Sequence, residues 1–243
     1  MADFTQLMNN GFGVVTVMDV CIYEKKGGYG EGSDCCAVLP AGQTAVTGEP
    51  YDASSWVATG QKLDTLKISN LNQEGPTKTI TGGKYSVPLV KYGKTTTVEM
   101  QDALGSAMTL VRFFGCELGT STNKGARISV GDKFPHPFAM EGKTFFIDRV
   151  TGKEVELYIF MPQFYPEGIL NLTQDAEGDA AVFDLNGTLI STWICDDVAT
   201  ESTAHTKRKV AYEIREKSFF AATPTADSSD SAFNPADYQF ANS

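Results

Sequence analysis

Histidine and long apolar runs are scarce in this sequence of 243 residues, and each scarcity argues against a class of protein. The two histidines are His136 and His205, and neither has a second ligand at the spacing of a metal site. No apolar run approaches the ~20 residues that a membrane helix requires. The start, Met1–Thr5, lacks the basic segment of a signal peptide. We therefore expect neither a leader nor insertion into a membrane.

Catalytic signatures are also absent from the sequence. It contains no P-loop, no Gly-x-Ser-x-Gly elbow and no His-Glu-x-x-His pair. The five cysteines are odd in number and include no Cys-x-x-Cys, which is typical of reduced thiols in a cytoplasmic protein. We predict a protein that is not an enzyme and that uses no cofactor and no metal.

Basic residues are missing from one long stretch, although the chain has 20 of them against 30 acids and a net charge of −10. Lys153 is the last base before Lys207, and the residues between them carry the whole excess of acid. Clustered Lys and Arg hold nucleic acid, so this chain is a poor candidate for gripping DNA. We interpret the stretch as a surface that repels an anionic polymer; the alternative is a solvated acidic face without a role. Its ten acids are Glu154, Glu156, Glu167, Asp175, Glu177, Asp179, Asp184, Asp196, Asp197 and Glu201.

Alternation of apolar and polar residues predicts a mainly β protein, with a hydrophobic fraction of 42% that is sufficient for a core. In residues 154–161 the aliphatic side chains share one face of a strand, and Glu154, Glu156, Tyr158 and Phe160 share the other. Further strands are expected at 13–23, 65–70, 77–80, 84–92, 143–150, 169–174 and 180–185, with 188–195 extending the last. Residues 207–215 fit an exposed edge strand or an amphipathic segment.

One flanking α-helix is expected at 97–114. The run Thr96-Thr97-Val98-Glu99 has the form of a capping box. Apolar residues then recur at helical spacing, and Gly115 is placed to end the helix. These apolar residues are Met100, Leu104, Met108, Val111 and Phe114.

Residues 25–60 are rich in glycine and predict a long loop or hairpin with a role in interaction; the alternative is a partly disordered insertion. Its aromatic residues, Tyr29, Tyr51 and Trp56, are candidate contacts with a neighbouring subunit. We expect one β domain over 1–200 and a C-terminal extension over 201–243. That extension is predicted to be an edge strand followed by a flexible arm, because 221–243 contains no Lys or Arg and is rich in Ala, Ser, Thr and Asp.

The stretch 169–188 resembles the closing hairpin of major tail tube proteins of tailed bacteriophages. It carries an acidic turn, Ala176-Glu177-Gly178-Asp179, followed by Val182-Phe183-Asp184-Leu185-Asn186-Gly187. The preceding Tyr158-Ile159-Phe160-Met161-Pro162 is similar to the strand before that hairpin. Upstream of this hairpin, the segments 62–71, 88–92 and 97–115 occur in the order that is usual for the family. The resemblance covers roughly residues 11–195.

The resemblance implies two packed antiparallel sheets, a β-sandwich or barrel, with one flanking helix. It also implies hexameric rings that stack into a tube in the virion tail, assembled in the cytoplasm of the host bacterium. The expected partners are further copies of the chain, a tape-measure protein, a tail terminator and baseplate or initiator proteins, while DNA passes through without specific binding. On this reading Glu154, Glu156, Asp175, Glu177, Asp179 and Asp184 are the candidate acids of the channel or its rim.

Two alternatives remain at this stage. A β-sandwich adhesin or carbohydrate-binding module would use Tyr29, Tyr51 and Trp56 to stack on sugar rings. A tube protein of a contractile injection system is the nearer alternative, as is a tail component that stops at one ring. Stable monomers that bind glycans would favour the first alternative, and rings or tubes would favour the tail protein.

Overall fold

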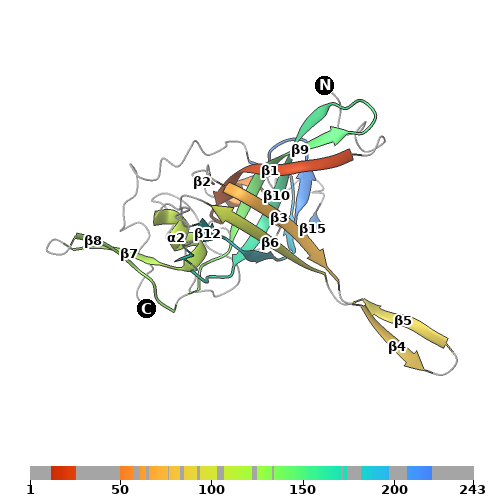
Figure 1. The fold of residues 1–243 in the computed structure, drawn as a ribbon, viewed down its shortest axis with the longest axis horizontal. Helices are drawn as coiled ribbons and strands as arrows, with labels where there is room; N and C mark the ends of the chain where they lie inside the picture. The colour runs from red at the N-terminus through yellow and green to blue at the C-terminus, as the bar shows by residue number, and fades with distance from the viewer. Residues whose placement is uncertain are drawn as a thin grey trace, which may run out of the picture.

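The computed structural model describes residues 12–25, 50–56, 61–63, 66–75, 77–82, 85–91, 94–102, 107–121, 125–132, 134–170, 172–173, 182–196 and 207–220. Within these residues the prediction of a mainly β fold is confirmed, since strands make up most of the described chain and one α-helix accompanies them (Figure 1).

Ten strands form one antiparallel sheet. Its main path runs β11–β12–β6–β13–β10–β9–β1–β2, while β3 pairs with the other edge of β6 and β16 pairs with β10. The sheet curls until β1 lies beside β3, so the two expected layers are opposite walls of one sheet. Its strands are β1 (Phe12–Tyr23), β2 (Gln61–Leu63), β3 (Leu66–Glu74), β6 (Thr95–Asp102), β9 (Phe138–Asp148), β10 (Glu154–Pro166), β11 (Leu172–Thr173), β12 (Val182–Asp184), β13 (Gly187–Leu189) and β16 (Glu213–Arg215).

The main core fills the inside of the curl. On β10 the aliphatic face predicted from the alternation is buried: Val155, Leu157, Ile159 and Met161 are all at most 9% exposed. Ile159 and Met161 belong to the main core, whereas Val155 and Leu157 form a smaller cluster with Phe146. Across the core lie side chains of β6, β1 and β9, and one end is covered by α2 (Ala107–Phe114). Burial of each large apolar side chain contributes about 1.5–3 kcal/mol, so this inner face dominates the stability of the fold. The other members include Val20, Ile22, Val98, Met100, Phe113, Phe114, Phe138, Met140 and Phe164.

The predicted helix at 97–114 is wrong in its first half. Residues 95–102 form β6, and the helix is confined to Ala107–Phe114. The run from Thr95 to Met100 suits a strand because β-branched residues fit a pleated surface, and pairing with β3 along the whole length of β6 decides the outcome. The predicted stop is confirmed: Gly115 has a φ of 65°, and its N–H donates to the Val111 carbonyl.

The outer face of β1, β9 and β10 is covered by two segments that are distant in the sequence. Residues 50–56, which include the 3-10 turn Ala53–Ser55, pack there together with Phe219 and Phe220. The Phe160 ring of β10 stacks on Phe219 with ring centroids 4.1 Å apart. This part of the sheet is therefore buried on both faces, like the centre of a three-layer structure.

The C-terminal part of the chain differs from the expected separate extension. Residues 207–215 do not form one edge strand but two short strands: β15 (Arg208–Val210) pairs with β14 (Thr192–Ile194), and β16 pairs with β10. Phe219 and Phe220 are each 7% exposed. The chain through Phe220 thus belongs to the same folded unit as the β domain, and residues 221–243 lie outside the described part.

Two hairpins project from the curled sheet (Figure 1). One consists of β4 (Thr77–Gly82) and β5 (Tyr85–Lys91), and the other of β7 (Glu117–Ser121) and β8 (Gly125–Ser129). Each hairpin forms a two-stranded sheet of its own. An isolated two-stranded hairpin is marginally stable at best in water.

Candidate functional surface

One wall of the curled sheet turns a hydrophilic face away from the core. In β6 the side chains of Thr96, Val98 and Met100 point inward and are at most 4% exposed. Since successive side chains of a strand alternate between faces, Thr95, Thr97, Glu99 and Gln101 point outward. Residues directly opposite in an antiparallel pair share a face, so the register of β6 with its neighbours extends this outward surface across three strands.

The surface so defined, called the polar face here, contains acids, amides and hydroxyls. Among the side chains that the structure describes on it, none is Lys or Arg. Its acids are Glu74, Glu99 and Asp184, and none of the three takes part in an ion pair within the described residues. The remaining members are Asn70, Asn72, Thr95, Thr97, Gln101 and Thr188.

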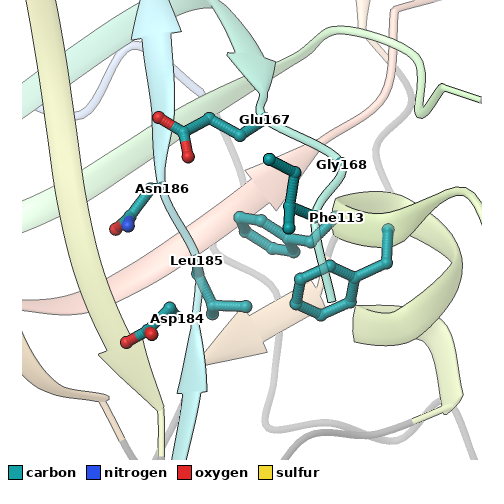
Figure 2. A pocket seen from close by; sticks show the side chains of 8 residues that line it. Phe113, Glu167, Gly168, Asp184, Leu185 and Asn186 are labelled. Atoms are coloured by element: carbon teal, nitrogen blue, oxygen red, sulfur yellow. The ribbon is translucent and has the colours of Figure 1, made fainter. Parts of the chain in front are cut away.

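Asp184 is fixed on the polar face by its neighbours. The Gln101 Nε2 group donates to its carboxylate at 3.0 Å. The next residue points the other way, because Leu185 is fully buried and its N–H donates to the Met100 carbonyl at 2.9 Å. Figure 2 shows the carboxylates of Glu167 and Asp184 and the Asn186 amide on one side of this strand, away from Phe113 of α2.

The recess between these groups and α2 is small, with a volume of about 20 Å³. The Asn186 side-chain oxygen accepts a hydrogen bond from the Met100 N–H, and the Asn186 backbone carbonyl accepts one from the Glu167 N–H. These two bonds hold the lining of the recess to β6 and to the residue that follows β10. Over the described part of the chain, no group of three or more His, Cys, Asp or Glu side chains could hold a metal ion.

Close packing explains why the last residue of the motif in 182–187, Gly187, is a glycine. A Cβ atom built there would lie 2.3 Å from the Tyr165 carbonyl oxygen and 2.4 Å from the Phe164 ring. Glycine therefore lets β13 approach β10 closely while it also pairs with β6. This close approach joins the wall carrying the polar face to the rest of the sheet.

Two of the predicted acids, Glu154 and Glu156, lie far from the polar face. Both are exposed at the start of β10, on the outer side of the β9–β10 hairpin. The end of β10, Pro166, pairs with Gly187 beside the polar face. In the register of the sheet, the near end of the polar face at Thr95 lies level with Gln163 of β10. Seven residues of strand, about 23 Å along the sheet, separate Gln163 from Glu156. Of the six candidate acids, Glu154 and Glu156 thus lie apart from Asp184; Asp175, Glu177 and Asp179 lie outside the described residues.

Basic residues from other parts of the chain form ion pairs with two acids of the acidic stretch. Lys143 Nζ lies 3.5 Å from the Glu156 carboxylate. Asp196 pairs with Arg208 at 2.9 Å and with Arg215 at 2.8 Å. The hydrogen bond from Arg208, helped by Arg215, holds the pKa of the Asp196 carboxyl below its usual value despite partial burial. Part of the acidic stretch is therefore neutralised by bases in the folded protein, whereas the described side chains of the polar face include no base.

Two of the three aromatic residues proposed for the Gly-rich loop are buried. Tyr51 is 5% exposed and Trp56 is 2% exposed. The Trp56 ring meets Phe160, Phe219 and Phe220 edge to face, with ring centroids 5.6 to 5.8 Å apart. Neither ring can reach a sugar or a neighbouring subunit while it is packed in this way, so the structure differs from the expectation; Tyr29 lies outside the described residues.

Glu74 and Glu99 are the members of the polar face that the sequence interpretation missed. Glu99 was assigned to the capping box of a helix that does not form at that position. The signal that could have identified it is the alternation of Thr95, Thr97 and Glu99 with buried neighbours at even positions.

Comparison of the sequence with protein-family models and with curated proteins finds no match. In the portion of the chain that is described, no helix is long and apolar enough to cross a membrane.

Proposed function

We propose that this protein is a structural subunit of a tube, the tail tube of a tailed bacteriophage, in which six copies form a ring and rings stack. In this proposal the polar face lines the channel. The observation that carries it is a wall of sheet, backed by the core, whose described outward side chains are acidic or uncharged and include no base.

The chemistry of the polar face suits the passage of duplex DNA. Each Lys or Arg that neutralises a phosphate releases counterions and holds the DNA in place, so a channel for ejection needs a wall without them. Amide and hydroxyl groups keep a water layer on the wall. Three acids per subunit give eighteen carboxylates per ring of six, and they repel phosphates over the Debye length of about 8 Å at physiological salt.

Free strand edges and projecting hairpins support assembly. Within the described residues, β3 pairs through one edge only, and the β4–β5 and β7–β8 hairpins pair only within themselves. Unpaired edges are a hazard in a monomer and a joining surface in a closed ring. We propose that these elements contact neighbouring copies, and that the ends of the tube meet a terminator and baseplate or initiator proteins, with a tape-measure protein inside.

The place of assembly in this proposal is the host cytoplasm, and the final location is the virion tail. A tube of a contractile injection system has the same requirements for a ring and a channel. The glycan-binding alternative loses two of the three aromatic rings on which it depended, because Tyr51 and Trp56 are buried.

Negative-stain electron microscopy of the purified chain over a range of concentrations tests the proposal. Six-fold rings or hollow tubes that increase with concentration are expected. A compact monomer at every concentration would overturn it. Glycan binding by that monomer would favour the adhesin alternative.

A further inference from the structure

An open groove separates the β15–β16 segment from the β3–β6 wall. It has a volume of about 860 Å³ and opens on the side of the sheet opposite the polar face. Val210, Ala211, Tyr212 and Ile214 give it a partly buried apolar floor that continues into the main core. Such a floor accepts the side chains of an extended peptide better than it accepts water.

The charges of this groove are opposite to those of the whole chain. Lys94 and Lys209 line it, both are exposed, and neither pairs with a carboxylate within the described residues. The acid in the lining, Glu213, is already bound by Arg208 at 2.8 Å and by Arg215 at 3.3 Å. In a chain of net charge −10, the groove therefore presents two cations that no described carboxylate neutralises.

The backbone of β16 adds a second means of recognition. β16 pairs with β10 through Tyr158–Phe160, and no described strand pairs with its other edge. An extended segment can form main-chain hydrogen bonds to a free strand edge while its side chains enter alternate positions. The groove thus suits an extended, acidic segment that carries apolar side chains.

Residues 221–243 of the same chain have this composition. They contain three acids and no Lys or Arg, and three aromatic side chains follow in their second half. Their attachment point, Phe220, lies six residues after Ile214 of the groove, hence within about 20 Å of it. Linkage at such a distance raises the effective concentration of the segment to roughly the millimolar range. The residues concerned are Asp227, Asp230, Asp237, Phe233, Tyr238 and Phe240.

We propose that residues 221–243 dock into the groove of their own subunit, with the Asp carboxylates near Lys94 and Lys209 and aromatic side chains on the apolar floor. The inference does not depend on the tube function. It describes the free subunit, and it makes the groove a site that a partner with an acidic segment has to enter by displacement.

Zero-length carbodiimide cross-linking of the full chain tests this docking. A 1:1 mixture of ¹⁴N- and ¹⁵N-labelled monomer is cross-linked at low concentration and analysed by mass spectrometry. We expect links from Asp227, Asp230 or Asp237 to Lys94 or Lys209 in which both peptides carry the same isotope. The Lys62–Asp19 ion pair at 3.1 Å is an internal positive control. Absence of these links while the control forms, or links of mixed isotope, would overturn the proposal.

Charge reversal provides a second, independent readout. In the Lys94→Glu/Lys209→Glu variant, hydrogen exchange of the 221–243 peptides should accelerate at least fivefold. The Lys153→Glu/Lys217→Glu variant, which changes the net charge equally at two exposed positions, should leave it within twofold of wild type. Adding Asp227→Lys, Asp230→Lys and Asp237→Lys to the first variant should restore the slow exchange. Equal exchange in all four proteins would contradict the docking.

Discussion

Glu141 is a carboxylate buried beneath the C-terminal segment 216–220, and it holds that segment on the sheet. It is 5% exposed and accepts a hydrogen bond from the Phe219 N–H at 2.7 Å and one from the Ser218 hydroxyl at 2.5 Å. Burial raises the pKa of the Glu141 carboxyl, and these two hydrogen bonds together with nearby Arg215 oppose the rise. The Phe220 ring that follows stacks on Tyr23 with centroids 3.5 Å apart.

The raised pKa of Glu141 fixes the sign of a pH effect on stability. Between the ordinary value of 4.5 and the folded value, the folded protein binds more protons at this group than the unfolded chain does. The stability contributed by this group is therefore greatest at low pH and falls as the pH rises through that window. Urea unfolding of wild type and Glu141→Gln from pH 7 to pH 4 should show the difference shifting in favour of wild type as the pH falls. A difference that stays constant would contradict this account.

The two tryptophans provide a matched test of the outer layer. Trp56 is 2% exposed within the aromatic cluster, whereas Trp193 is 41% exposed. Trp56→Ala should lower the free energy of unfolding by about 3–5 kcal/mol because it leaves a cavity between the sheet and Phe219. Trp193→Ala should cost about 1 kcal/mol or less. Equal losses in denaturant titrations would mean that residues 50–56 are not a packed part of the fold.

At the scale of elements, the sequence predicted most reliably the features that depend on a single strand or helix. The faces of β10 followed from its alternation, and the end of α2 followed from Gly115. β6 was misread because Met100, Val111 and Phe114 also fit a helical spacing, and the choice depends on pairing with β3 and β13, which a local pattern does not contain. Burial of Trp56 depends on Phe219, a residue more than 160 positions later.

The junction at β13 gives a prediction at the same scale. Gly187→Ala places a Cβ against the Tyr165 carbonyl and the Phe164 ring, so it should destabilise the fold by about 1–3 kcal/mol or more. Gly131→Ala is the matched control, because nothing lies within 4 Å of a Cβ at that position. Thermal unfolding of the two variants should differ clearly. Similar melting temperatures would show that β13 is not held tightly between β6 and β10.

At the scale of the whole molecule, the acids that are clustered in the sequence are not the same set as the acids that share one surface. The described acids of 154–206 lie at separate places in the fold, and Glu156 and Asp196 have basic partners. The polar face instead combines Asp184 with Glu74 and Glu99, which lie outside that stretch. Sequence predicted that one surface would lack bases, but the register of β3, β6 and β12 was needed to find which surface it is.

Charge reversal on the polar face should convert the proposed channel wall into one that retains DNA. Glu99→Lys would add six cations per ring, and assembled tubes of this variant should bind short duplex DNA with an affinity that falls steeply with salt. Glu216→Lys has the same change in charge at an exposed site elsewhere and should behave like wild type. Fluorescence anisotropy of labelled duplexes at several salt concentrations measures the effect. Identical binding by both variants would count against a channel role for this face.

The most direct measurement is cryo-electron microscopy of the assembled protein at a resolution that traces side chains. The account predicts stacked six-fold rings in which the Glu99 and Asp184 side chains point into the channel and the Phe160 layer lies away from it. A particle that stays a single chain at every concentration would contradict the account. So would an assembly in which the polar face points outward or is buried between rings.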